Sequence, residues 1–243
     1  MSKLRRFRVD SLEAAAVGAV ITLPETEAKH ARVLRLQPGE AVELFDAQGR
    51  CAEGSIEPGE PLVVRIRTVR APREEGRGTV TVAVAWPKGK RAGVLVEKCS
   101  ELGVNCILPT RFARSIVSKD EESEGISRLR RIAAEAAKQC GRGDVPEIGS
   151  EKAFEQVLSS AAKNTLCVLL DPRAGESLAT VLERDWHAGM SLLLIVGPEG
   201  GFTAEEMHAA DRAGVVRARM AETVLRVETA ALAACAIAAC AKL

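Results

Sequence analysis

Short hydrophobic stretches interleaved with polar residues dominate the first seventy residues of the chain. A hydrophobic period of two residues is typical of strands that bury one face. Strands are therefore predicted at residues 19–23, 41–56 and 61–69, the second folded back on itself by a turn at residues 46–49. One helix is predicted between the strands, at residues 25–36, and it ends before Pro38-Gly39.

The pattern changes after residues 71–78, APREEGRG, which are polar and carry no hydrophobic period. We therefore predict two domains, at residues 1–72 and 73–243. In the second domain strands are predicted at residues 79–86, 104–110, 165–170, 191–197 and 214–220, and helices at residues 90–102, 126–140, 151–161, 177–184, 204–213 and 228–242. Strands separated by helices predict an α/β fold, with a mostly parallel sheet that helices cover on both faces.

The composition indicates a globular protein, with 47% hydrophobic and 28% charged residues. The longest run of low polarity, residues 229–240, spans under ~20 Å as a helix, and a bilayer core needs ~30 Å. The first residues lack the apolar segment of an export signal. None of the seven cysteines has the spacing of a zinc or redox pair. We expect reduced thiols, a cytoplasmic protein, no membrane segment and no metal site.

Charge is unevenly distributed along the chain, although the net charge is only +1. Residues 79–142 hold twelve Lys and Arg against seven Asp and Glu, a net +5, whereas residues 143–243 hold nine against fourteen, a net −5. A basic middle segment and an acidic end favour a polyanionic partner on one side of the molecule.

A hydrophobic strand runs directly into a glycine-rich turn at residues 191–206, SLLLIVGPEGGFTAEE. Phosphate-binding loops carry a Lys, and the dinucleotide motif reads GxGxxG, and neither is present here. Glu199 would repel a phosphate, so a neutral or cationic ligand fits better. S-adenosylmethionine is such a ligand, because its adenosine is neutral and its sulfonium is positive. A tight turn without a ligand is the alternative for this segment.

Six segments, in order along almost the whole chain, carry a resemblance to a known family: RFRVD at residues 6–10, HARVLRLQPGE at 30–40, EKCSELGV at 97–104, residues 114–148, VGPEGGFTAEE at 196–206, and ETVLRVETAALAACA at 222–236. The chain resembles the RsmE family of SPOUT methyltransferases, which methylate N3 of a uridine in bacterial small-subunit ribosomal RNA. It departs from the family pattern at Met220-Ala221, where Leu-Gly is usual, and at Val227, where Thr is usual.

The resemblance implies a PUA-like β-barrel at the N-terminus and a SPOUT α/β domain with a C-terminal trefoil knot. It also implies S-adenosylmethionine as cofactor, a homodimer, and uridine 1498 of the 16S rRNA as the target, methylated on the small ribosomal subunit. The cofactor would lie across three strand ends. Its expected contacts are Leu170, Asp171, Pro172, Val196, Gly197, Pro198, Glu199, Gly200, Gly201, Met220 and Leu225.

Methylation of uracil N3 requires removal of the N3 proton, or stabilisation of the anion that its loss creates. Arg226 could supply positive charge, and Glu228 or Glu101 could accept the proton. Glu228 could equally be an ordinary first-turn carboxylate, and Glu101 could simply pair with an arginine. Arg114, which lies in a family motif within the basic segment, completes the catalytic candidates.

RNA contacts are expected from both domains. The residues, taken from the matching motifs and the N-terminal domain, are Arg6, Arg8, His30, Arg35, Lys119, Gln139 and Arg142. Guanidinium groups bind phosphates well, and a chain with no Tyr and two Trp is poorly suited to base stacking. Two other functions remain open: an RNA methyltransferase with a different target, and an RNA-binding protein without catalysis.

Overall fold

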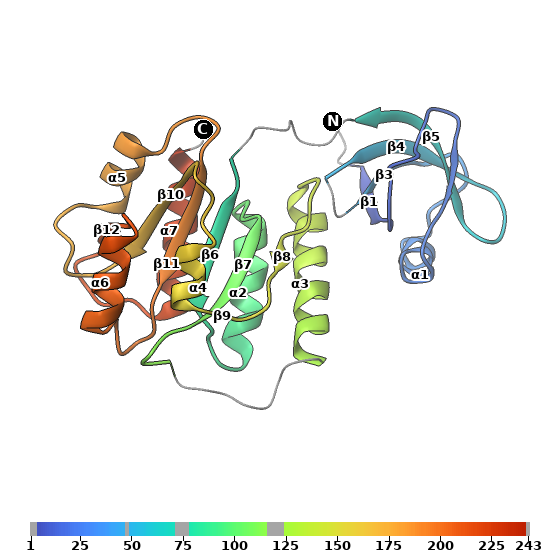
Figure 1. Ribbon diagram of the computed structural model, residues 1–243. Coiled ribbons are helices and arrows are strands. Elements are labelled where there is room, and N and C mark those ends of the chain that lie inside the picture. The colour runs from blue at the N-terminus through green and yellow to red at the C-terminus, as the bar shows by residue number, and fades with distance from the viewer. Residues whose placement is uncertain (1–3, 47–48, 71–77, 116–123, 242–243) are drawn as a thin grey trace. The chain divides into compact units, whose positions relative to one another are not determined.

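The computed structural model describes residues 4–46, 49–70, 78–115 and 124–241. The chain forms two compact units (Figure 1). The first unit holds residues 1–75 together with residues 137–145, and the second holds residues 76–136 and 146–243. The predicted boundary at residues 72–73 lies outside the described residues and stays a prediction.

The first unit is built on a five-stranded sheet with the order β1-β3-β4-β5-β2. Its elements are β1 (Arg5–Arg8), β2 (Val20–Thr22), α1 (Glu25–Val33), β3 (Ala41–Phe45), β4 (Cys51–Glu57) and β5 (Val63–Arg70). β1 lies parallel to β3, and the other pairs are antiparallel. Alternate residues, such as Val42 and Leu44 of β3 and Val64 and Ile66 of β5, are buried in one core with Phe7. The predicted turn at residues 46–49 lies partly outside the described residues.

A segment from the middle of the chain completes this unit. Lys138, near the end of helix α3 (Glu124–Cys140), forms an ion pair of 2.8 Å with Glu27 of α1, and both side chains are largely buried. The side chain of Arg6 donates hydrogen bonds to the carbonyl oxygens of Ala137 and Arg142. Side-chain contacts with distant residues therefore hold residues 137–145 in the first unit.

The second unit contains a seven-stranded sheet with the order β12-β10-β11-β6-β7-β8, in which β9 also pairs with β7. Its strands are β6 (Val80–Ala85), β7 (Cys106–Arg111), β8 (Glu147–Ile148), β9 (Lys152–Ala153), β10 (Thr165–Leu170), β11 (Ser191–Val196) and β12 (Val216–Ala218). Every pair is parallel, so the carboxyl ends of all the strands lie on the same edge. The predicted parallel α/β sheet is confirmed.

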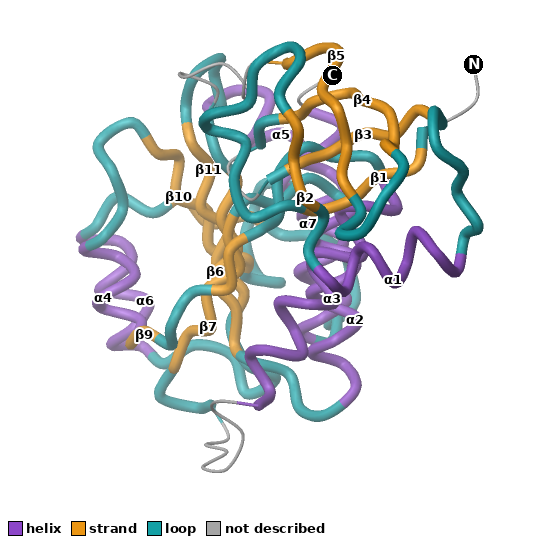
Figure 2. The backbone as a smooth tube through the Cα atoms, turned by 90° about the vertical axis from the view of Figure 1, so that its right-hand side faces the viewer, coloured by secondary structure: helices purple, strands orange, loops and turns teal. Residues whose placement is uncertain are grey.

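Helices cover both faces of this sheet (Figure 2). They are α2 (Lys90–Glu101), α4 (Phe154–Ser159), α5 (Leu178–Asp185), α6 (Ala204–Arg212) and α7 (Val227–Ala241), together with most of α3. Helix α7 packs on β6 and β11 and contacts α2 and α5, while α4 and α6 pack together near β7 on the other face. The Ala-rich composition of α7 lets it lie close to the sheet, with Ala231, Ala234 and Cys235 fully buried. Within the described residues no helix is long and apolar enough to cross a membrane.

The structure differs from the predicted elements mainly at short segments. The helix predicted at residues 151–161 begins as strand β9, and only residues 154–159 are helical. Strands β1 and β8 were missed. β1 contains one fully buried apolar residue, Phe7, among three arginines, and β8 is two residues long, so neither has a hydrophobic period.

Candidate cofactor and methyl-transfer site

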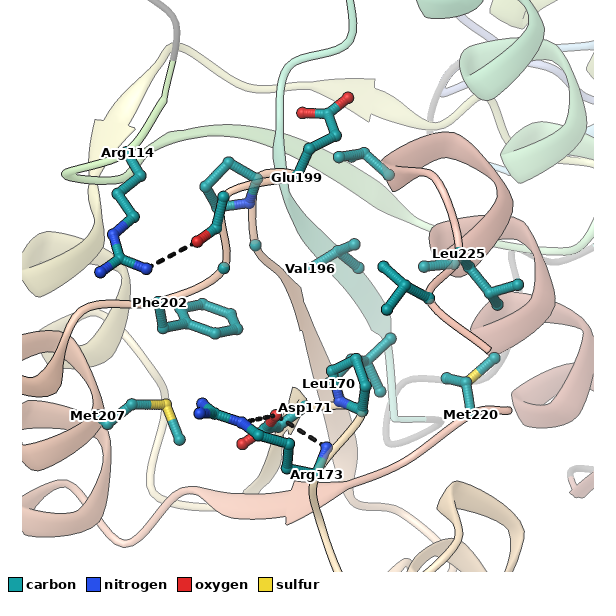
Figure 3. A pocket seen from close by; sticks show the side chains of 18 of the residues that line it. Arg114, Leu170, Asp171, Arg173, Val196, Glu199, Phe202, Met207, Met220 and Leu225 are labelled. Atoms are coloured by element: carbon teal, nitrogen blue, oxygen red, sulfur yellow. Dashed lines mark hydrogen bonds and ion pairs between the residues drawn. The ribbon is translucent and has the colours of Figure 1, made fainter. Parts of the chain in front are cut away.

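A pocket of about 560 Å³ opens at the carboxyl ends of β10 and β11 (Figure 3). Parallel α/β sheets commonly bind ligands at this edge, where the strand order reverses. All eleven residues expected to contact a cofactor line it, together with residues that were not among the expected cofactor contacts. These additional residues are Arg114, Arg173, Phe202, Thr203, Ala204, Met207, Ala221, Thr223, Val224, Val227 and Ala230.

The end of β10 supplies one wall of the pocket. Leu170 is largely buried, and the backbone N–H of Asp171 donates a hydrogen bond of 3.0 Å to the carbonyl oxygen of Ala218, which ties β10 to the end of β12. The buried carboxylate of Asp171 accepts hydrogen bonds from the backbone N–H of Arg173 at 3.0 Å and from its Nε at 3.3 Å (Figure 3). Asp171 therefore shapes the loop and orients Arg173 along the pocket.

The glycine-rich turn follows β11 directly and forms the second wall. The backbone N–H of Gly201 donates a hydrogen bond of 2.8 Å to the carbonyl oxygen of Pro198, and Gly201 has a φ of +68°, which favours glycine. A Cβ atom at Gly197 would lie 2.6 Å from the ring of Phe202. That ring packs against Phe112 and Phe154, with centroid distances of 5.5 and 6.1 Å. The aromatic cluster therefore requires glycine at position 197.

A buried carboxylate connects the turn to the loop after β7. Glu206 is 4% exposed, and it accepts hydrogen bonds of 2.8 Å from the backbone N–H groups of Thr203 and Ala113. The Thr203 side chain in turn accepts a hydrogen bond from the Glu206 N–H, so the two residues form a capping box at the start of α6. The adjoining Arg114 donates a hydrogen bond of 2.8 Å to the carbonyl oxygen of Gly200 (Figure 3).

Two carboxylates meet one guanidinium near the glycine-rich turn. Nη1 of Arg91, in the first turn of α2, lies 4.0 Å from Oε1 of Glu199 and 3.8 Å from Oε2 of Glu228. Glu199, which was expected to repel a phosphate, therefore has a counterion in Arg91. Its negative charge favours a cationic ligand less than the sequence alone suggested.

The four catalytic candidates occupy different places. Arg114 lines the pocket, and Glu228 lies in the first turn of α7, directly after the pocket residue Val227. Arg226 is exposed, and its carbonyl oxygen accepts a hydrogen bond from the N–H of Ala230. Glu101 pairs with Lys98 at 2.8 Å at the last turn of α2, about 15 Å along the helix from Arg91. Within this chain Glu101 is too far from the Arg91–Glu228 pair to share its role.

The residues expected to bind RNA fall into two groups. The side chains of His30, Arg35 and Gln139 are exposed, Arg8 is half-buried, and Lys119 lies outside the described residues. Arg6 and Arg142 are instead used inside the first unit. The Arg6 side chain is 5% exposed and pairs with Glu43 at 2.8 Å, and Arg142 is 10% exposed and forms two hydrogen bonds with the carboxylate of Asp144. The structure therefore gives both arginines a role in the fold, and their expected RNA contacts stay a prediction.

The sequence matches known RNA methyltransferases. A family model described as an RNA methyltransferase domain matches residues 74–239, and a model described as an RNA methyltransferase PUA domain matches residues 23–66. The ribosomal RNA small subunit methyltransferase E of Mycobacterium bovis is 33% identical over 236 residues, which cover 94% of this chain and 88% of that protein.

Solved structures give the same result. The ribosomal RNA small subunit methyltransferase E of Neisseria gonorrhoeae, bound to S-adenosylmethionine, is 27% identical, with a TM-score of 0.83 over 96% of both chains. A methyltransferase-like protein of Legionella pneumophila, in complex with the same cofactor, is 29% identical, with a TM-score of 0.81 over 97% of both chains. The predicted fold class, a SPOUT α/β methyltransferase domain after an N-terminal PUA-like domain, is confirmed. The chain belongs to the family of ribosomal RNA small subunit methyltransferases E, also called RsmE.

Proposed function

We propose that the protein transfers the methyl group of S-adenosylmethionine to N3 of a uridine in the 16S rRNA of the small ribosomal subunit, and that this uridine is the one numbered 1498. Membership of the family supports an activity on small-subunit rRNA. The observation that carries the cofactor is the pocket: its eleven expected residues converge in a fold that matches two structures bound to S-adenosylmethionine.

The residues of the pocket fit this cofactor. Its volume of about 560 Å³ lies within the range of ligand sites. Leu170, Met220 and Leu225 present apolar side chains to the same space, suited to adenine (Figure 3). The glycines of the turn let the backbone approach a ligand closely, so that its N–H and C=O groups can bind polar edges. When bound, S-adenosylmethionine supplies an electrophilic methyl group on a positive sulfur.

The protein's own part in the reaction is to orient the base and remove its proton. As the methyl group bonds to N3, the N3–H bond breaks, and we assign the proton to the carboxylate of Glu228. Oε2 of Glu228 is buried and has no hydrogen-bond partner among the described residues, so it can accept one from a substrate. Arg114, at the pocket, and Arg226, just before α7, can stabilise the negative charge on the uracil oxygens. Holding N3 in line with the methyl group can lower the barrier by several kcal/mol, with ~7–11 kcal/mol as the upper range for well-oriented reactants.

Recognition of the RNA rests on charge and shape in this proposal. Arg8, His30, Arg35, Lys119 and Gln139 remain the expected contacts, and guanidinium contacts to phosphates would position the subunit. The proposal includes a homodimer in the cytoplasm. The small residues of α7 and the family resemblance support the dimer, because small side chains let two helices approach closely.

Analysis of the rRNA tests this function. In a strain that lacks the gene, N3-methyluridine should disappear from the 16S rRNA at position 1498, and the wild-type gene should restore it. A Glu228→Gln variant should restore little of the modification. Purified enzyme with S-adenosylmethionine labelled in the methyl group should label small subunits from the deletion strain and not those from the parent. N3-methyluridine that persists at this position in the deletion strain would reject the assignment.

A further inference from the structure

Arg91 lies at the first turn of α2 and faces two carboxylates from distant parts of the chain. Glu199 belongs to the glycine-rich turn that lines the pocket, and Glu228 belongs to the first turn of α7. The nitrogen Nη1 of Arg91 is 4.0 Å from Oε1 of the former and 3.8 Å from Oε2 of the latter. One guanidinium therefore connects the expected cofactor turn with the expected proton acceptor.

The local helix does not favour a cation at this position. The N-terminus of a helix carries a partial positive charge, which makes a cation in the first turn unfavourable by about 0.3–1 kcal/mol. The first turn of α2 nevertheless has Lys90 and Arg91, no acidic residue, and Gly89 as N-cap with no side-chain hydrogen bond. The two carboxylates from outside the helix supply the compensating charge for Arg91.

Both contacts are ion pairs without a hydrogen bond, because both distances exceed 3.5 Å. The Glu228 side chain is 13% exposed, and its Oε2 atom has no hydrogen-bond partner among the described residues. A buried polar atom without a partner is uncommon and costs free energy. Arg91 thus provides charge to Glu228 while leaving that oxygen open to a donor from a ligand.

We propose that Arg91 is a positioning residue for methyl transfer. Its guanidinium holds the Glu228 carboxylate in the first turn of α7, next to the pocket residue Val227, with Oε2 free to receive the N3 proton. It also holds Glu199 so that the glycine-rich turn keeps the shape that binds the cofactor. This inference rests on the proposed function for its proton-transfer part. The link to Glu199 concerns cofactor binding alone and needs no RNA.

Two consequences follow from the two contacts. Loss of the charge at position 91 leaves the two carboxylates without this counterion, so the Glu228 side chain should move from its present position and kcat should fall. Release of Glu199 should loosen the glycine-rich turn and weaken the binding of S-adenosylmethionine. Both ion-pair partners of Arg91 are carboxylates of the protein itself, so the affinity for RNA should change little.

The test combines substitutions of Arg91 and Glu228 in the full-length protein. We expect Arg91→Gln to lower kcat on small subunits about tenfold or more, and to raise the Kd of S-adenosylmethionine severalfold in calorimetry without RNA. The KM for subunits should stay within about twofold. Arg91→Lys should recover most of the kcat, because it retains the charge. Arg184→Gln is the matched control: Arg184 of α5 pairs with Glu176, just before that helix, and with Asp185, and it does not line the pocket, so its variant should resemble the wild type.

A double-mutant cycle decides whether Arg91 acts through Glu228. If it does, Arg91→Gln combined with Glu228→Gln should have the kcat of Glu228→Gln alone. If the two substitutions lower kcat independently, so that their effects multiply in the double variant, the inference is overturned. It is also overturned if Arg91→Gln has the same kinetics as Arg184→Gln. If Arg91→Gln fails to fold, Arg91→Ala, which also removes the charge, replaces it in the cycle. Methylation of a different nucleotide by the wild type would refute the proposed target, and the cycle could still be measured on that nucleotide.

Discussion

The guanidinium of Arg6 donates a hydrogen bond of 2.6 Å to the carbonyl oxygen of Arg142, a residue 136 positions later in the sequence. The same side chain donates to the carbonyl oxygen of Ala137 and to the carboxylate of Glu43, and its charged carbon lies 4.6 Å from the ring centroid of Phe45. The carbonyl oxygen of Ala137, in the last turn of α3, also accepts a hydrogen bond of 3.2 Å from the N–H of Gly141, so Arg6 adds a second donor to it. One strand of the N-terminal sheet is thereby joined to the loop after α3.

Arg6→Ala should destabilise the protein strongly. The substitution removes the Arg6 donor from the partly buried Glu43 carboxylate and from the carbonyl oxygens of Ala137 and Arg142, and breaking a buried ion pair typically costs about 3–5 kcal/mol. Chemical denaturation of the full-length protein measures the loss. Arg5→Ala, at the exposed neighbouring position, is the control and should change the free energy of unfolding by less than about 0.5 kcal/mol. Equal losses for the two variants would contradict the role of Arg6.

Arg142 and Arg35 should respond differently in RNA binding. Arg142 is committed to Asp144, so Arg142→Ala should lower stability and leave the dependence of RNA affinity on salt concentration unchanged. Arg35 is exposed, and its loss should lower the salt slope by up to about one unit if it contacts a phosphate. Asn is the suitable replacement, because Arg35 has a φ of +54°, which Asn tolerates. Binding titrations at several salt concentrations measure both slopes, and a lower slope for Arg142→Ala would restore it as an RNA contact.

Gly197→Ala should impair cofactor binding more than Gly200→Ala. At Gly197 a Cβ would lie 2.6 Å from the ring of Phe202, which cannot move without disturbing Phe112 and Phe154. At Gly200 a Cβ would lie 3.3 Å from the side chain of Arg114, which is exposed and can shift. We expect the affinity for S-adenosylmethionine to fall about tenfold or more, at least ~1.4 kcal/mol, for Gly197→Ala, and only severalfold for Gly200→Ala. Calorimetry checks the order, and the reverse order would refute the packing argument.

Alkylation should distinguish Cys106 from Cys240. Burial raises the pKa of the Cys106 thiol to about 11, and the nearby Glu147 carboxylate adds to the effect. Only the thiolate reacts, so at pH 8 its thiolate fraction should be about a hundredfold smaller than that of an unperturbed thiol with pKa 9, and it should keep rising until the pH passes about 11. Mass spectrometry after treatment with iodoacetamide should find the exposed Cys240 modified first. Equally fast modification of the two at pH 8 would contradict the raised pKa.

Hydrophobic periodicity was sufficient for the longer elements. Strand β10 has the predicted bounds, and α2 and α6 end within one residue of prediction, because each buries a regular apolar stripe. Hydrophobic periodicity did not reveal strands that form only because they pair with a strand distant in the sequence. β1 has one fully buried apolar side chain and is held by β3, and β9 is held by β7, so the local sequence carried no strand signal for either.

The site shows the same division. The glycine-rich turn could be recognised in the sequence because its glycines directly follow a strand. The pocket residues at the end of β10 and in the segment before α7 were predicted from the family resemblance. Arg91 was missed because its partners lie more than a hundred residues away, although a cation in a helix's first turn was a usable signal. The RNA contacts expected of Arg6 and Arg142 remain predictions: sequence shows that an arginine is charged, and only the fold shows that its donors also bind groups of the protein itself.

Residues 137–145 belong to the N-terminal unit although they lie far along the sequence, and this constrains the order in which the nascent chain can fold. The ribosome adds about 5–20 amino acids per second, so several seconds separate the emergence of Arg6 from that of its acceptor carbonyls. During this time the Arg6 and Glu43 side chains can pair with each other, while the remaining guanidinium donors stay with water. The N-terminal unit therefore cannot finish folding until β6 and β7, the first strands of the second unit, have been synthesised.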